Sequence, residues 1–76
     1  MKYEQLVEWV NEASVTSGLD VRCVHLTNDN YTQLMSDVSI RHLALATKDG
    51  TMLYGAIIKV DKNLSEQPGY FIEYAE

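Results

Sequence analysis

The Asp49-Gly50 pair constrains the fold of this chain more than any other short segment does. It lies between two runs rich in β-forming and apolar residues, 39–47 and 51–61. An Asp-Gly pair favours a two-residue hairpin loop, because a type I′ turn needs positive φ at both central positions. The sequence therefore predicts an antiparallel hairpin. Its predicted pairs are Lys48 with Thr51, Thr47 with Met52, and Ala46 with Leu53.

Alternation along this hairpin predicts two faces, and both are apolar. The first face consists of Leu43, Leu45, Met52, Tyr54, Ala56, Ile58 and Val60. The second consists of His42, Ala44, Ala46, Leu53, Gly55 and Ile57. A solvated sheet face would carry more polar residues. Three explanations remain open: one helix covers each face; both helices share a face and the second face meets another chain; or the register differs by one residue, which would swap the faces.

The remaining elements are predicted from periodicity and capping residues. Apolar residues at helical spacing predict a helix over 3–17, which Gly18 ends. Residues 20–27 predict a strand, and Thr27 or Asn28 begins a second, shorter helix that continues to Val38. A last strand is predicted at the end of the chain, within 70–76. The order α-β-α-β-β-β predicts one α+β domain over 1–76, with two helices and a small, mostly antiparallel sheet.

Length and cysteine count limit how such a domain is stabilised. A chain of 76 residues buries a modest core, and many small domains add a disulfide, a metal or a partner subunit. Cys23 is the only cysteine, so an internal disulfide is excluded, and two histidines are too few to complete a structural zinc site. We therefore expect no metal or other cofactor, and we expect support from a protein partner, which includes a second copy of the chain.

Charge and hydropathy narrow the class of partner. The net charge is −5, and the six basic residues are scattered, which argues against direct nucleic-acid binding. No apolar run has the length of a membrane span, and residues 1–10 are typical of an amphipathic helix rather than a signal peptide. We expect a cytoplasmic protein without a membrane partner.

Few residues are candidates for catalysis. Cys23 and His25 lie on the same side of a predicted strand, where a Cys–His pair could form an activated thiolate. A cysteine in a strand is more often a small buried apolar residue, and no neighbour in the sequence orients the histidine. His42 lies on the second hairpin face, where it is more typical of an interface. We therefore expect no enzymatic activity, and an enzyme using Cys23 or His42 is the least favoured alternative.

Three glutamates on the first helix form a candidate surface for a basic partner. Glu4, Glu8 and Glu12 follow one another at i, i+4 spacing and line one face of the helix. Such a stripe is most often a solvated surface. It also permits an alternative function, in which the chain inhibits a host defence or nucleic-acid-binding protein by occupying a basic site.

The segment from Val24 to Ile72 resembles small accessory proteins of tailed bacteriophages. The resemblance rests on "YTQLM", on the hairpin segment "LYGAIIKVDKNL" and on the final strand "YFIEY". It implies a phage-encoded accessory protein, located in the host cytoplasm or in the virion, and it implies no catalytic residue. Together with the residue patterns, it favours a non-enzymatic, acidic interaction protein, a structural or accessory component that acts through the second hairpin face or forms a homo-oligomer.

Overall fold

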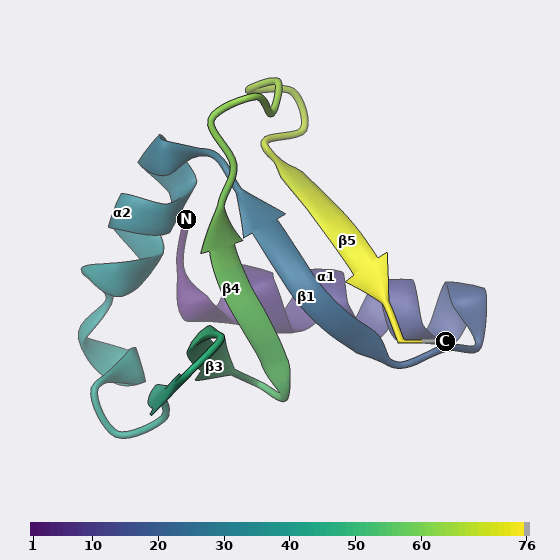
Figure 1. Cartoon of the computed structure of the whole chain (residues 1–76), viewed down its shortest axis with the longest axis horizontal. Coiled ribbons are helices and arrows are strands. Elements are labelled where there is room, and N and C mark those ends of the chain that lie inside the picture. Colours follow the sequence, from purple (N-terminus) through teal and green to yellow (C-terminus); the bar gives the residue numbers. More distant parts are fainter. Residues whose placement is uncertain (76) are drawn as a thin grey trace.

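The computed structural model describes residues 1–75 and has two layers, a five-stranded sheet and a helical layer on one of its faces. The helices are α1 (Tyr3–Ser17), α2 (Asn28–Met35) and a 3₁₀ turn, η1 (Val38–Ile40). The strands are β1 (Val21–Leu26), β2 (Leu45–Thr47), β3 (Gly50–Leu53), β4 (Ala56–Val60) and β5 (Tyr70–Tyr74). In Figure 1, α1 runs behind the sheet and α2 lies beside β4. The predicted α+β class is confirmed, with one strand more than expected.

The sheet has the order β2-β3-β4-β1-β5 and is mostly antiparallel. The pairs β2–β3, β3–β4 and β1–β5 are antiparallel, whereas β1 and β4 are parallel. The parallel pair brings the N-terminal half of the chain against the hairpin segment. Strands β2 and β5 form the two edges of the sheet.

The helix boundaries agree with the capping residues in the sequence. Helix α1 spans the predicted residues and ends at Gly18, which has φ 73° and donates from its N–H to the Ser14 carbonyl. Helix α2 begins after Thr27, whose Oγ1 accepts a hydrogen bond from the Asn30 N–H at 3.3 Å. It ends at Met35 and not at Val38, because Asp37 begins the separate turn η1.

Asp37 holds two helical segments together. Its carboxylate accepts hydrogen bonds from the Tyr3 N–H at 2.9 Å, at the start of α1, and from the Ser39 N–H and Oγ at 3.0 and 2.8 Å. It therefore caps a helix distant in the sequence as well as its own turn. This local capping explains why residues 38–40, predicted partly as strand, are helical.

The hydrogen bonds to Asp37 predict a loss of stability in acid. The donated bonds, the Tyr3 N–H foremost, lower the pKa of the Asp37 carboxyl below its ordinary value. A carboxyl whose pKa is lower in the folded state stabilises the fold above its ordinary pKa, and this contribution disappears as the pH falls through the folded-state pKa. We expect the melting temperature to fall between about pH 5 and pH 2, and to fall less steeply in Asp37→Asn. Thermal unfolding followed by circular dichroism at each pH measures both slopes, and equal slopes would contradict this role.

The predicted hairpin loop lies one residue too late, so each predicted partner is wrong by two residues and the faces of β2 and β3 are not swapped. The two-residue loop is Lys48-Asp49, and Thr47 pairs with Gly50, so that Leu45 faces Met52. Thr47 Oγ1 donates to the Gly50 carbonyl at 2.6 Å and accepts from the Asp49 N–H at 3.2 Å, which fixes the loop one residue earlier. Gly50, at φ 132°, supplies the conformation that other residues rarely adopt.

A second turn divides the predicted strand 51–61 into β3 and β4. Tyr54 and Gly55 have φ of 51° and 77°, which are the positive values that a type I′ turn requires. The Tyr54 hydroxyl donates to Asn11 Oδ1 of α1 at 2.9 Å and anchors this turn to the helix. Because of the turn, Leu53 and Ala56 become direct partners on one face.

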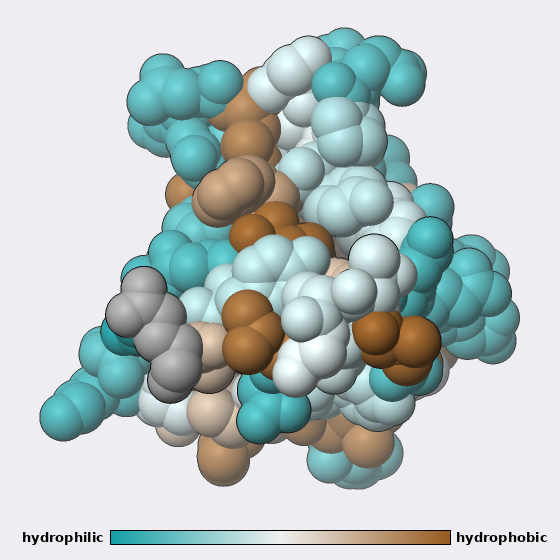
Figure 2. Space-filling model, turned by 90° about the vertical axis from the view of Figure 1, so that its right-hand side faces the viewer, coloured by the Kyte–Doolittle hydropathy of each residue, from teal (hydrophilic) through white to brown (hydrophobic). Residues whose placement is uncertain are grey.

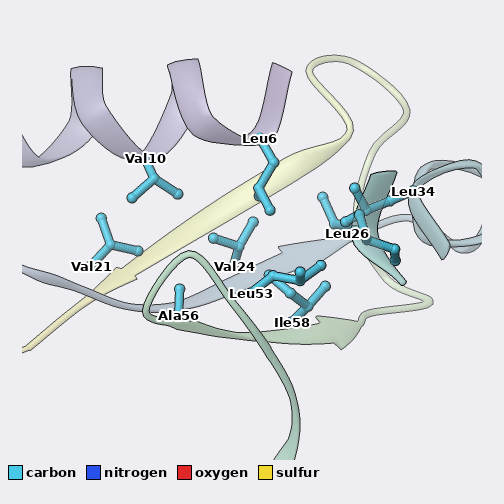
Figure 3. Packing of buried hydrophobic residues seen from close by; sticks show 10 residues of the cluster. Leu6, Val10, Val21, Val24, Leu26, Leu34, Leu53, Ala56 and Ile58 are labelled. Carbon is cyan, nitrogen blue, oxygen red and sulfur yellow. The ribbon is translucent and has the colours of Figure 1, made fainter. Parts of the chain in front are cut away.

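The core lies between the sheet and both helices. Leu6 of α1 points toward Val24 of β1, Val10 points toward Val21, and Leu34 of α2 lies beside Leu26 (Figure 3). Leu53, Ala56 and Ile58 complete this cluster from β3 and β4. Both helices thus cover the same face of the sheet, which excludes the arrangement with one helix on each face.

Candidate interaction surface

The face of the sheet opposite the helices carries a continuous row of neighbouring residues, one from each strand. Side chains that are direct partners across adjacent strands point to the same face. Strand pairing connects Leu45 with Met52, Met52 with Ile57, Ile57 with Cys23, and Cys23 with Glu73. Four of these five side chains are apolar or a thiol. We call this set, Leu45, Met52, Ile57, Cys23 and Glu73, the open-face row.

A second row lies next to the first on the same face. His25 is the direct partner of Lys59 on one side and of Phe71 on the other. The His25 and Phe71 rings lie 5.7 Å apart. This row contributes the exposed ring of Phe71, the imidazole of His25 and the ammonium group of Lys59.

Several of these apolar side chains are unusually exposed. Leu45 is 60% exposed and Phe71 is 55% exposed, while Met52 and Ile57 are half-buried. Neither helix lies over this face, which is turned toward the viewer in Figure 1. An apolar area left open on a small domain is typical of an interaction site.

A shallow hollow of about 170 Å³ lies where the two rows meet. Its lining residues are Arg22, Cys23, Asp49, Ile57, Lys59 and Glu73. Two basic and two acidic residues line the hollow, so its surface is mainly polar and their formal charges cancel. Glu73 connects several groups, with Oε1 3.4 Å from His25 Nε2 and Oε2 3.9 Å from Arg22 Nε.

The chemistry of Cys23 does not favour nucleophilic catalysis. Cys23 and His25 do lie on one side of β1, and Glu73 lies across the strand pair from the thiol. The side chain of Cys23 is only 2% exposed, and this burial raises the pKa of the thiol. Lys59 and Arg22 oppose the shift, and Glu73 adds to it. The thiol is therefore mainly protonated at neutral pH, which makes it a poor nucleophile.

The second hairpin face predicted from the sequence does not exist as one surface. Leu53 is fully buried in the core, on the helix side of the sheet, whereas Ile57 lies on the open face. Ala46 pairs with Thr51 on the helix side, and Gly55 lies in the turn before β4. His42 and Ala44 are exposed but precede β2, in the segment that follows η1. The second turn explains this redistribution, because it removes Gly55 from the strands and turns Ile57 to the face opposite Leu53. Ile57 alone remains on the candidate surface.

The acidic stripe of α1 is present as predicted, with Glu4, Glu8 and Glu12 all exposed. It lies on the helical layer and not on the open face. The chain therefore has two chemically different surfaces, a neutral apolar one and an acidic one. Among residues 1–75, no group of three or more histidine, cysteine or acidic side chains is arranged to hold a metal ion.

Sequence reasoning placed Leu45 and Met52 on one hairpin face, as observed, but missed Phe71 and Glu73 as residues of that face. The alternation of β5, with Phe71 and Glu73 on one side of the strand and Tyr70, Ile72 and Tyr74 on the other, was available as a signal. The sequence contains no signal that shows which strand β5 pairs with.

Comparisons with protein-family models, with curated proteins and with solved structures found no match for this chain. In the part of the chain that the structure describes, no helix is long and apolar enough to span a membrane.

Proposed function

We propose that this protein acts by binding, without catalysis, and that its open face binds a second copy of the chain. The observation that carries the proposal is the apolar part of the open-face row, where the exposed Leu45 and the half-buried Met52 and Ile57 lie side by side with no helix over them. Covering this row would remove apolar surface from water, which is the main favourable term in most protein association.

The charge distribution makes this face the one on which a second copy meets little repulsion. The chain carries a net charge of −5, so two copies repel one another on most of their surfaces. Around the hollow, Arg22 and Lys59 balance Asp49 and Glu73. A two-fold axis through this region can place the basic groups of one copy opposite the acidic groups of the other, as a self-complementary interface requires.

The area of the face sets the expected strength of the dimer. Five strands about 4.8 Å apart, each about five residues long, give a flat area of roughly 20 by 17 Å. This is small compared with the roughly 800 Å² per partner of a standard stable interface. We therefore expect a weak dimer, with a dissociation constant on the order of micromolar or above.

The resemblance of residues 24–72 to accessory proteins of tailed bacteriophages supports a more specific form of the proposal. In that form, the chain is a phage-encoded structural or accessory component, which associates through its sheet while its helical layer remains available to other proteins.

Dilution followed by NMR spectroscopy tests which face is used. We expect the amide signals of β1, β4 and β5 that neighbour Cys23, Ile57 and Glu73 to shift between about 1 mM and 10 µM protein, a range chosen for a weak dimer. Signals of α1 and α2 should stay constant. Shifts confined to the helices would contradict the assignment of this face.

A further inference from the structure

A groove between α1 and the edge strand β5 has the chemistry of a cation-binding site. Its volume is about 250 Å³, and its lining residues are Trp9, Glu12, Ala13, Thr16, Tyr70, Ile72 and Tyr74. The groove lies on the helix side of the sheet, because Tyr70 and Ile72 are partners of the core residues Leu26 and Val24. It is therefore separate from the open face.

The walls of the groove come from aromatic residues held by the fold. The rings of Trp9 and Tyr70 are stacked, with centroids 3.9 Å apart and an angle of 20° between their planes. Tyr74 lies four residues farther along the same side of β5, which corresponds to about 13 Å. Ala13 lies one turn after Trp9, and its small side chain leaves the space between these aromatic residues open.

The only charged residue lining the groove is acidic. Glu12 is exposed and continues the stripe of Glu4 and Glu8 along α1. Aromatic rings and a carboxylate together favour a cation, because the ring faces attract positive charge and the carboxylate pairs with it. The net charge of −5 also attracts a basic partner from a distance.

The adjacent strand edge determines the shape of the partner. Strand β5 is the last strand of the sheet, so in the described chain one of its sides pairs with no other strand. An extended segment of another protein can pair with β5 along this side. Every second side chain of that segment would then lie on the face of the sheet that the helices cover, next to the groove. Figure 2 views the molecule from this side, where hydrophilic and intermediate residues dominate and apolar residues form separate small areas. This surface suits a polar partner better than an apolar one.

We propose that the groove of Trp9, Glu12, Tyr70 and Tyr74 binds a lysine or arginine side chain of an extended basic segment that pairs with β5. The proposal is independent of self-association through the open face, because the two surfaces lie on opposite faces of the sheet. It also gives the acidic stripe of α1 a specific role, in which Glu12 contacts the bound cation while Glu4 and Glu8 contribute only long-range attraction.

Fluorescence of Trp9 provides a direct test, since it is the only tryptophan in the chain. The probe is a capped peptide of alternating threonine and lysine, and the control peptide has glutamine in place of lysine. We expect saturable fluorescence changes with the lysine peptide, and binding of the glutamine peptide weaker by about tenfold or more. Equal binding of the two peptides would overturn the proposal.

Two variants assign the binding to the groove itself. Glu12→Gln should weaken binding of the lysine peptide by about fivefold, whereas Glu4→Gln, which removes the same charge outside the groove, should change it by less than about twofold. Ala13→Leu should fill the groove and weaken binding while the circular dichroism spectrum stays native. Equal effects of Glu12→Gln and Glu4→Gln, or tight binding to Ala13→Leu, would show that the groove is not the site. Each variant's mass in solution shows separately whether self-association is intact.

Discussion

Leu53→Lys should leave the chain largely unfolded. Leu53 is fully buried between the sheet and the helices, so lysine would place a charge in the core without a partner. Truncating such a leucine costs about 2–5 kcal/mol, and burying an unpaired charge adds to this. A domain of this size is stable by only about 4–11 kcal/mol, so most or all of its stability would be lost. Far-UV circular dichroism and urea titration measure the effect.

Leu53→Met is the matched control, because it preserves volume and polarity and should cost less than about 1.5 kcal/mol. The pair of variants distinguishes the observed fold from the hairpin predicted by the sequence. In the predicted hairpin, Leu53 lies on an interface and its lysine variant would fold but fail to associate. A folded Leu53→Lys protein with an unchanged urea midpoint would therefore contradict the burial of Leu53 beneath the helices.

Ile57→Lys should preserve the fold and abolish most self-association. Ile57 is half-buried at the middle of the open-face row, so lysine can extend into solvent in the monomer. In a two-fold dimer each substitution counts twice, and losing about 1 kcal/mol of apolar burial per copy raises the dissociation constant by about thirtyfold. Sedimentation equilibrium measures this change directly.

Val15→Lys is the control for added charge. Val15 is 84% exposed on α1, and the same substitution there changes the net charge equally without touching the open face. It should leave the dissociation constant within about twofold of the original value. If Val15→Lys weakened association as much as Ile57→Lys does, general charge effects and not the open face would control association.

The parts of the fold that depend on local sequence signals could be predicted. Helix α1, its Gly18 cap and the Thr27 cap of α2 follow from periodicity and from side chains that satisfy free backbone groups. The Tyr54-Gly55 turn could not be predicted, because tyrosine rarely adopts positive φ and this conformation is stabilised by a hydrogen bond to Asn11 in a distant helix. The one-residue shift at Thr47 likewise depends on a side-chain hydrogen bond that competes with the Asp-Gly signal.

The candidate surface was harder to predict than the fold, because it depends on strand order. The open-face row joins residues from all five strands, and its composition changes whenever a strand slips by one residue. Cys23 and His25 were correctly placed on one side of β1. Their neighbours Glu73 and Phe71 belong to β5, and Glu73 lies 48 residues after His25 in the sequence. Chain topology, and not residue pattern, brings them together.

The mass of the unmodified protein in solution tests the central claim most directly. Light scattering coupled to size exclusion, from about 10 µM to 1 mM, covers the range expected for a weak dimer. We predict a rise from 8.6 kDa toward twice that value with increasing concentration, and in Ile57→Lys a rise that begins only at a concentration about thirtyfold higher. A mass that stays at 8.6 kDa over the whole range would contradict the claim that the open face binds a second copy.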